Sequence, residues 1–223
     1  MLQLWHRLVD NENPDSLAAR LRRRRFHLFK KLLGTINHQP INILDVGGTM
    51  SYWQTMPCSD LPEIKLTLLN ICECETDDCN IATCVGDARN LQQFADKQFD
   101  VVFSHSVIEH VGNYPDQCQM AQEILRVGKN YFIQTPNYYF PLEPHFLFPC
   151  FQFLPLATRT MLLRHFNLGW YSKTRDRELA RKKAESIRLL TRRELAALFP
   201  GGKIMEEKYF GLTKSLLISN LRL

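Results

Sequence analysis

The chain has 223 residues and a formal net charge of +5, and 45% of its residues are hydrophobic while 23% are charged. This composition is typical of one globular domain, and it excludes an intrinsically disordered or collagen-like chain. No run of about 18 apolar residues is present, which excludes an apolar membrane-spanning helix. The first residues lack the apolar stretch of a signal peptide, so we expect a cytoplasmic protein without a membrane anchor.

The chain contains seven cysteines, and an odd number without a secretion signal favours reduced thiols over a disulfide framework. Four of them form a cluster in the sequence: Cys72, Cys74, Cys79 and Cys84. Their spacing does not match the paired C-x2-C pattern of structural zinc sites. No acidic cluster offers another set of ligands, so the sequence predicts no metal site.

The first element in chain order is a basic helical extension over residues 1–38. Leucines recur at nearly helical spacing between 15 and 36, and Asp15 or Ser16 can cap the start of this helix. The segment 20–31 holds seven Lys or Arg residues and no acidic residue. Such a run is either a solvated helix face or a contact surface for an anionic partner.

One such partner is an anionic membrane. If the helix over 15–36 lies on it, its arginines and the rings of Phe26 and Phe29 would reach the lipid and bring the lid to it. A second basic stretch, 173–193, carries nine basic residues against three acidic ones. A solvated helix face is the favoured explanation of both stretches, and an anionic partner is the alternative.

Strands and helices alternate after the extension. Short apolar runs that end at Gly, Pro or polar residues predict strands over 41–46, 65–70, 81–85, 99–104 and 130–134, and a helix over 115–127. Alternation of this kind is typical of a doubly wound, mainly parallel sheet.

The pattern changes after Pro136. Residues 137–190 are rich in aromatic residues and prolines, then in charges, and we expect them to form a lid or cap that includes a helix over 175–190. A capping box at Thr191–Glu194 opens the next helix.

Two adjacent antiparallel strands over 203–210 and 215–219 complete the predicted sheet. The sequence thus predicts a single α/β domain over 1–223. It is Rossmann-like and doubly wound, with a seven-stranded, mainly parallel sheet whose last strand is antiparallel.

The most informative motif is the apolar run over 41–46, which ends in an aspartate and meets two glycines. Gly47 and Gly48 have no Cβ, so the backbone can turn sharply and approach a ligand there. By itself this turn indicates only a nucleotide-like ligand.

Four blocks together resemble class I S-adenosylmethionine-dependent methyltransferases. They are Leu44-Asp45-Val46-Gly47-Gly48-Thr49, Val85-Gly86-Asp87-Ala88, the stretch from Phe99 to Val111, and Tyr209-Phe210-Gly211-Leu212-Thr213-Lys214-Ser215. Their order and spacing resemble the family over about residues 36–220, although the usual third glycine of the first block is missing.

The resemblance implies S-adenosylmethionine as the cofactor, bound beyond the carboxyl ends of the strands. The cofactor-binding residues that it implies are Asp45, Gly47, Gly48, Asn70, Asp87, Ala88, Ser104 and His105. The two glycines would pass under the amino-acid part of the cofactor, and Asp45 would orient that turn or reach the ammonium through water.

The remaining implied contacts concern the adenine, the methionine portion and the ribose. Asp87 would accept from the adenine amino group, with a backbone donor at Ala88, and Ser104 and His105 would flank the methionine portion. The family usually has a carboxylate after the second strand to take the ribose hydroxyls, whereas this chain has Asn70. An amide forgoes the charge-assisted hydrogen bond, so either Asn70 serves or Glu73 reaches back.

His145 is the candidate general base for a hydroxyl acceptor, because histidine titrates near working pH and this residue follows the fifth strand. Glu109 and His110 resemble a family feature that shapes the pocket. The aromatic segment 137–171 favours a small hydrophobic or lipid-linked acceptor, unless its rings only cover the sheet.

Two alternative functions remain. An RNA methyltransferase would explain the arginines, since phosphate contacts provide affinity, but the sequence has no recognisable RNA-binding module. A catalytically inactive S-adenosylmethionine-binding or scaffold protein would explain the missing glycine and Asn70. A nicotinamide dehydrogenase fits less well because the later blocks do not match it. The oligomeric state is not predicted.

Overall fold

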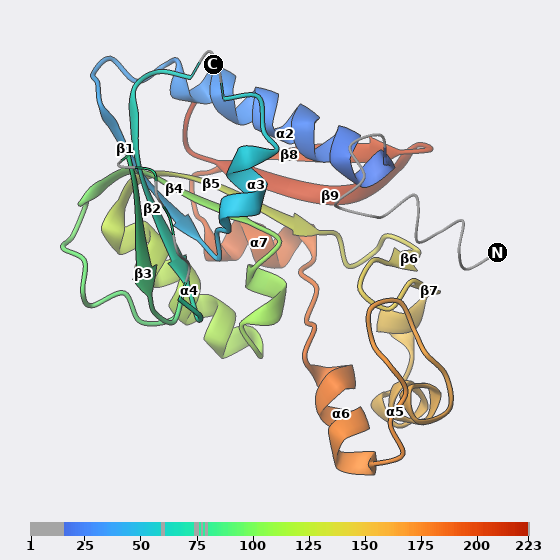
Figure 1. The fold of residues 1–223 in the computed structure, drawn as a ribbon. Coiled ribbons are helices and arrows are strands. Elements are labelled where there is room, and N and C mark those ends of the chain that lie inside the picture. Colours follow the sequence, from blue (N-terminus) through green and yellow to red (C-terminus); the bar gives the residue numbers. More distant parts are fainter. Residues whose placement is uncertain (1–15, 59–60, 74–75, 77, 79, 223) are drawn as a thin grey trace.

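A computed structural model of the chain describes residues 16–58, 61–73, 76, 78 and 80–222. Its main sheet has seven strands in the order β3-β2-β1-β4-β5-β9-β8 (Figure 1). The strands are β1 (Ile41–Val46), β2 (Ile64–Asn70), β3 (Ile81–Val85), β4 (Phe99–His105), β5 (Gly128–Pro136), β8 (Lys203–Tyr209) and β9 (Leu212–Ser219). β9 is antiparallel to both of its neighbours, and the other strands run parallel to one another. The predicted fold class is confirmed.

The order of the strands reverses between β1 and β4. β1 pairs with β2 on one side and with β4 on the other, and the chain then continues outward through β5. In open α/β sheets a crevice forms at such a point, beyond the carboxyl ends of the strands. The glycine turn after β1 and the residues after β4 therefore lie next to each other at this edge.

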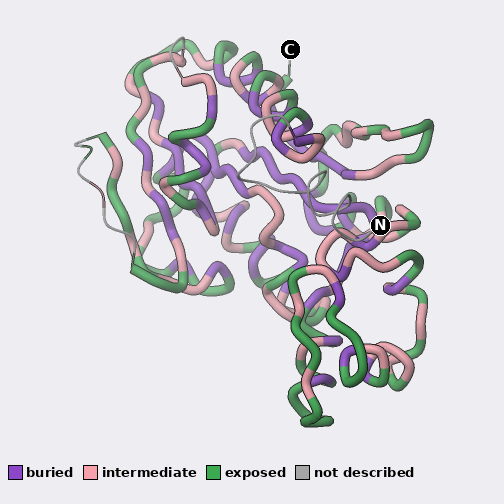
Figure 2. Tube along the Cα trace, turned by 45° about the vertical axis from the view of Figure 1, so that its right-hand side comes forward, coloured by how far each residue is buried: buried purple, intermediate pink, exposed green. Residues whose placement is uncertain are grey.

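Helices cover both faces of the sheet. On one face lie α2 (Leu17–Leu33) and the short α3 (Met50–Gln54), and on the other lie α4 (Tyr114–Val127) and α7 (Arg192–Leu198) (Figure 1). Side chains of one strand alternate between the two cores, as a strand buried on both faces requires. In β1, Ile43 packs in the core under α2, while Leu44 packs in the core with α4. Figure 2 shows this buried interior along the central strands.

α2 is shorter than the predicted helix, and its buried face contains Phe26 and Phe29 besides the expected Leu21 and Leu32. Ser16 caps it by accepting a hydrogen bond from the Ala19 N–H, whereas Asp15 lies outside the described residues. Phe26 and Phe29 are 0% exposed in the core. The expectation that these two rings reach lipid is wrong, because they pack against the sheet instead. Among the described residues, no helix is long and apolar enough to cross a membrane.

The segment between β5 and α7 forms a cap that projects from the carboxyl edge of the sheet (Figure 1). Its elements are β6 (Leu142–Glu143), β7 (Phe148–Pro149), the 3-10 helix η2 (Phe151–Phe153), α5 (Leu156–His165) and α6 (Arg177–Glu185). The cap has a hydrophobic core of its own, in which Phe146 and Phe151 stack at 4.1 Å between ring centroids. Part of the aromatic surface of 137–190 therefore stabilises the cap itself.

α6 ends earlier than the helix predicted over 175–190. Ser186 terminates it, and the chain then runs extended to Leu190, whose carbonyl accepts from the Tyr138 N–H. Residues 86–98, between β3 and β4, form turns rather than a helix. The alternation of strands and helices is thus less regular than the sequence suggests.

Candidate active site

A cavity of about 540 Å³ opens at the carboxyl ends of β1, β4 and β5. Its wall combines the glycine turn, the start of α3, residues after β4, one side of α2, the loop around β6 and the start of β9. A volume of this size is typical of small-molecule and cofactor sites. Of the nine predicted site residues, Asp45, Gly47, Gly48, His105 and His145 line this cavity.

The glycine turn is shaped by its neighbours as well as by its backbone. Gly47 has φ +80°, and a Cβ at this position would overlap the side chain of Val107. A Cβ on Gly48 would overlap the carboxylate of Asp45. Both residues therefore have to be glycine for the chain to pass closely between β1 and the cavity.

Asp45 is a buried carboxyl group at the end of β1. Its Oδ2 accepts a hydrogen bond of 2.7 Å from the indole Nε1 of Trp53 in α3. Burial raises the pKa of Asp45 to about 7, although the Trp53 hydrogen bond acts in the opposite direction. The carboxyl group therefore titrates near neutral pH beside the glycine turn.

His105 lies at the end of β4, and its ring centroid is 5.4 Å from the ring centroid of Tyr52. Burial, together with the positive charges of Arg25 and Arg22, lowers the pKa of His105 well below its ordinary value. Its buried Nε2 has no hydrogen-bond partner among the described residues. His105 is thus a neutral imidazole with one polar atom left for a ligand.

The other predicted cofactor residues lie outside the cavity wall. Ser104 Oγ donates to the Val46 carbonyl over 3.1 Å and ties β4 to β1. Asn70 Nδ2 donates to the Gly48 carbonyl over 3.1 Å, so this amide supports the glycine turn. Ala88 is buried, and Asp87 accepts three hydrogen bonds from the Arg89 guanidinium. The alternative ribose contact, Glu73, is exposed.

A cationic wall that the sequence did not indicate faces the same cavity. Arg22 and Arg25 of α2 and Lys214 of β9 line it, and Arg25 pairs with Glu207 at 3.4 Å. The Nε atoms of both arginines are buried without a hydrogen-bond partner among the described residues. Burial and the charge of Arg25 lower the pKa of Lys214 to about 8. The spacing of Ala18, Arg22 and Arg25 places them on one helix face, which is the signal that could have revealed this wall.

His145 lies in the cap part of the wall, after β6. Its Nδ1 is 2.7 Å from Oε1 of Glu143, and Oε2 of the same carboxylate accepts from the N–H groups of His145 and Phe146. Burial opposes protonation, but the hydrogen bond and charge of Glu143 and the charge of Glu109 raise the pKa of His145 overall. The ring of His110 meets it edge-on, with 4.7 Å between centroids.

Glu109 lies behind these two histidines, in the 3-10 helix η1 (Ile108–His110). It is 0% exposed, and its Oε2 accepts from the Thr135 hydroxyl over 3.0 Å. Burial raises the pKa of Glu109. Donor atoms of Glu109, His110 and His145 all lie within 4.8 Å of one another. Of the cysteine cluster, Cys74 and Cys79 lie outside the described residues.

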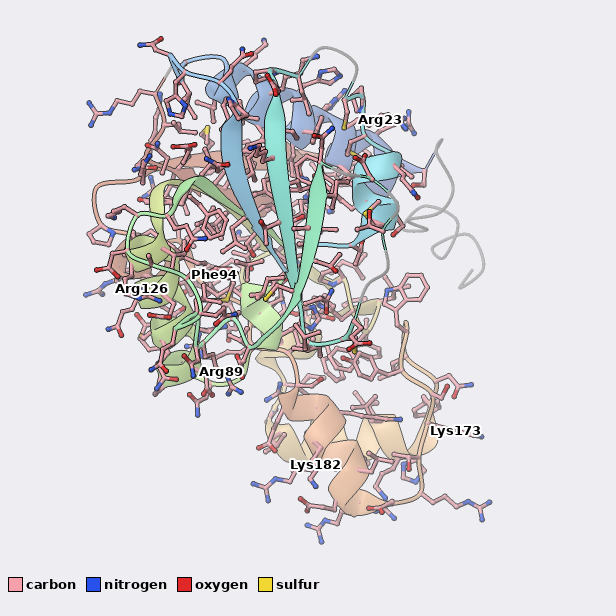
Figure 3. All side chains as sticks on the ribbon, turned by 60° about the vertical axis from the view of Figure 1, so that its left-hand side comes forward. Arg23, Arg89, Phe94, Arg126, Lys173 and Lys182 are labelled. Atoms are coloured by element: carbon pink, nitrogen blue, oxygen red, sulfur yellow. The ribbon has the colours of Figure 1, made fainter. Side chains whose placement is uncertain are left out.

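Only a part of the aromatic segment contributes to the site. Of the rings expected in the lid, Phe140 and Trp170 line the cavity, together with the apolar side chain of Leu142. Two basic residues of the cap, Lys173 and Lys182, extend outward from its surface (Figure 3).

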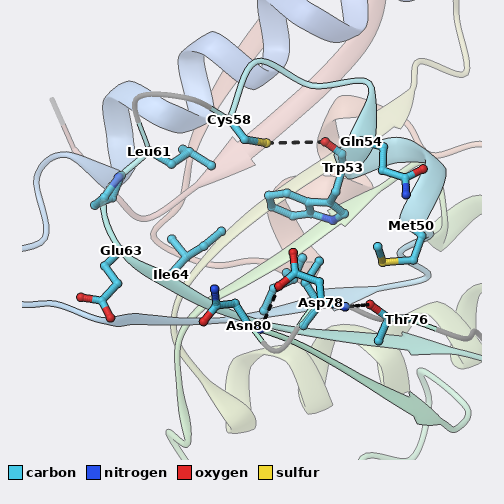
Figure 4. Close-up of a pocket in the computed structure, with 13 residues that line it drawn as sticks. Met50, Trp53, Gln54, Cys58, Leu61, Glu63, Ile64, Thr76, Asp78 and Asn80 are labelled. Atoms are coloured by element: carbon cyan, nitrogen blue, oxygen red, sulfur yellow. Dashed lines mark hydrogen bonds between the residues drawn. The ribbon is translucent and has the colours of Figure 1, made fainter.

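A second cavity of about 870 Å³ lies between α3 and the strands β2 and β3 (Figure 4). Trp53 lies across it from Ile64 and from Asn80, which are close to the amino ends of β2 and β3. Ligands of this fold bind at the opposite, carboxyl ends of the strands. The smaller cavity at the glycine turn is therefore the candidate active site.

Comparisons with known proteins agree with this geometry. Residues 60–131 match the family model of a methyltransferase domain. Two uncharacterized proteins of Mycobacterium tuberculosis, MT1557 and Rv1509, are each 39% identical over 67 residues, which is 30% of this chain. The match spans 23% of the length of these curated relatives.

Several solved structures share the fold at low sequence identity. The CurJ carbon methyltransferase has a TM-score of 0.58 at 14% identity, covering 98% of this chain and 65% of its own. The PH0226 protein from Pyrococcus horikoshii has a TM-score of 0.55 at 16% identity, and 97% of each chain is covered. A 1,6-didemethyltoxoflavin-N1-methyltransferase from Burkholderia thailandensis has a TM-score of 0.53 at 12% identity, covering 89% and 76%.

The sheet order, the crevice and these likenesses define the class I methyltransferase fold. The match of residues 60–131 to a methyltransferase domain agrees with the resemblance to class I S-adenosylmethionine-dependent methyltransferases found in the sequence.

Proposed function

We propose that this protein transfers a methyl group from S-adenosylmethionine to a small-molecule acceptor in the cavity at the glycine turn. One observation carries the proposal: Gly47 and Gly48, where the family holds the cofactor, share a single cavity with His145 of the cap. A cavity with a cofactor side and an acceptor side can bring the methyl group and the attacking atom together.

On the cofactor side, the amino-acid part of S-adenosylmethionine would lie along the glycine turn. Asp45 is positioned to attract the ammonium group in its ionised form. Arg22, Arg25 and Lys214 are positioned to bind the carboxylate, because their cationic groups line the same cavity. Hydrogen bonds between charged groups are about twice as strong as neutral ones, so this pairing would dominate cofactor affinity.

The chemical step is an in-line displacement at the sulfonium methyl group. A bond forms between the acceptor atom and the methyl carbon while the carbon–sulfur bond breaks, and S-adenosylhomocysteine leaves. The sulfonium supplies the reactivity, so the protein has to align the two partners and exclude water. We assign the acceptor side to His145, which the Glu143 carboxylate holds in place.

The wall also indicates the chemistry of the acceptor. Three cationic side chains line the cavity and Glu207 pairs with one of them, so one cofactor carboxylate leaves positive charge uncompensated. Phe140, Leu142 and Trp170 offer apolar surface nearby. We therefore propose a small acceptor that combines an apolar part with an anionic group, which narrows the hydrophobic acceptor expected from the sequence.

Transfer of labelled methyl groups tests the function. The protein is incubated with S-adenosylmethionine carrying a tritiated methyl group and with separate cell fractions of acidic metabolites, neutral metabolites, lipids and RNA. We expect label in the acidic-metabolite fraction and none with Gly47→Arg. Label in RNA would favour the RNA methyltransferase alternative. Tight cofactor binding without label in any fraction would favour the inactive binding protein.

A further inference from the structure

Glu109, His110 and His145 come together from two separate segments. The first two belong to η1, directly after β4, and the third belongs to the cap, more than 30 residues later. One donor atom from each lies within 4.8 Å of the other two. Ligands of a tetrahedral ion with bond lengths of about 2.1 Å lie roughly 3.4 Å apart, so the widest pair has to close by little more than 1 Å.

His145 and Glu109 each make one hydrogen bond to a neighbouring side chain, and each keeps a second donor atom for the ion. His145 Nδ1 bonds to the Glu143 carboxylate, which leaves Nε2 as the remaining ring nitrogen. Metal-binding histidines almost always donate their second N–H to a carboxylate or carbonyl in this way. Glu109 Oε2 accepts from Thr135, while Oε1 is buried and has no partner among the described residues.

Two buried carboxyl groups lie at this cluster. Glu109 is 0% exposed and Glu143 is 1% exposed, and the imidazole of His145 lies close to both of them. Buried carboxylates are costly unless a cation or hydrogen-bond donors compensate them. The charge of Arg25 acts on Glu109, but among the described residues no Lys or Arg donates a hydrogen bond to it. A divalent cation at this position would bond directly to the unpartnered Oε1 of Glu109.

We propose that Glu109, His110 and His145 bind a first-row divalent transition metal ion such as Zn²⁺ or Fe²⁺. Two imidazoles and one carboxylate are the ligands that these ions prefer, whereas Mg²⁺ and Ca²⁺ prefer oxygen ligands. Three protein ligands leave at least one coordination position for water or a ligand. Because His145 also lines the cavity, the ion lies at the acceptor side of the candidate active site.

Such an ion changes how the acceptor is activated. An acceptor hydroxyl bound to the ion has a lowered pKa and releases its proton to water, and the resulting oxyanion attacks the methyl group. His145 is then a ligand of the ion rather than the general base expected from the sequence. This consequence rests on the proposed function, whereas binding of the ion does not.

Metal titration of the chelator-treated, untagged protein tests the site without any activity assay. Co²⁺ serves as the probe, because its visible absorption reports imidazole ligands, and Zn²⁺ competes for the same site. We expect one equivalent of Co²⁺ to bind, Zn²⁺ to displace it, and Mg²⁺ to leave the spectrum unchanged. His110→Ala removes an exposed ligand at little risk to folding and should weaken binding by more than about 100-fold.

Two further variants and one control sharpen the test. Glu109→Gln should also lose the Co²⁺ spectrum, and Glu143→Gln should weaken binding by about 10- to 100-fold through the lost partner of His145. His27→Ala, an exposed histidine of α2, is the matched control and should bind like the wild type. Absence of Co²⁺ binding in the wild type, or unchanged binding in His110→Ala, overturns the proposal. Neither result bears on whether the protein binds S-adenosylmethionine.

Discussion

The indole Nε1 of Trp53 donates a 2.7 Å hydrogen bond to Oδ2 of Asp45, and this bond joins α3 to the end of β1. It holds the carboxylate against Gly48, where a Cβ would overlap it. The relationship explains how a five-residue helix fixes the geometry of the glycine turn. Burial raises the pKa of Asp45 to about 7 despite this hydrogen bond, and the first prediction follows from that shift.

Asp45 should make the stability of the protein depend on pH. Its folded-state pKa is raised from 3.8 to about 7, so its protonated form favours the folded state and this contribution is lost as the pH rises from about 4 to 7. Asp45→Asn removes the titration. Urea unfolding from pH 5 to 8 should show the variant gaining stability relative to the wild type as the pH rises.

The variant Trp53→Phe tests whether Asp45 causes this pH dependence. It removes the hydrogen bond that stabilises the ionised carboxylate, so the pH-dependent loss of stability should move to higher pH. A stability difference between Asp45→Asn and the wild type that stays constant over this range would contradict the raised pKa.

Gly47 and Gly201 form a matched pair for testing the glycine turn. Both have φ +80°, but a Cβ on Gly47 meets Val107 whereas a Cβ on Gly201 meets nothing within 4 Å. Gly201→Ala should cost only the backbone strain, about 1 kcal/mol. Gly47→Ala should lower the free energy of unfolding by about 1–3 kcal/mol more and should also weaken cofactor binding. Equal losses in the two variants, measured by urea unfolding, would show that Val107 yields without cost.

Substitution of Asn70 tests whether this residue supports the glycine turn or binds the ribose. Its Nδ2 donates to the Gly48 carbonyl and its Oδ1 accepts from the Ile71 N–H. Asn70→Asp loses the first bond, worth about 1 kcal/mol, so we expect roughly fivefold weaker binding of S-adenosylhomocysteine by calorimetry. Asn167→Asp, an exposed amide in the cap, should bind normally. Tighter binding by Asn70→Asp would instead indicate that position 70 contacts the ribose.

The cationic wall should stabilise bound S-adenosylhomocysteine mainly through the charges of its side chains. Arg22→Gln and Lys214→Met each remove one cation from the cavity and should weaken S-adenosylhomocysteine binding by about 10- to 100-fold. Arg24→Gln, an exposed arginine on the same helix, should have little effect. If all three variants bind equally well in calorimetry, the wall does not hold the cofactor carboxylate.

The sheet could be predicted from sequence because its central strands are apolar on both faces. Such runs, ending at Gly, Pro or polar residues, located the five strands β1 to β5 within a few residues of their observed bounds. The two predicted C-terminal strands also lie within a few residues of β8 and β9. The glycine turn was found for a similar reason, because it follows directly after the recognisable strand β1. Positions at strand ends converge in this fold whatever the intervening chain does.

Features that depend on tertiary packing could not be predicted in the same way. The leucine spacing of α2 placed the arginines away from the core, whereas Arg25 is buried and lines the cavity. α5 was not recognised because prolines precede it and its apolar residues pack only within the cap. The approach of His145 to Glu109 is set by the fold of the cap, for which the sequence gives no spacing rule.

Calorimetric titration of the wild-type protein with S-adenosylhomocysteine tests the central claim most directly. We predict saturable heat with one site per chain, and its loss in Gly47→Arg, which fills the turn while the thermal unfolding transition remains. Absence of heat with the wild type, or undiminished binding by a folded Gly47→Arg, would contradict the assignment of the cofactor to this cavity.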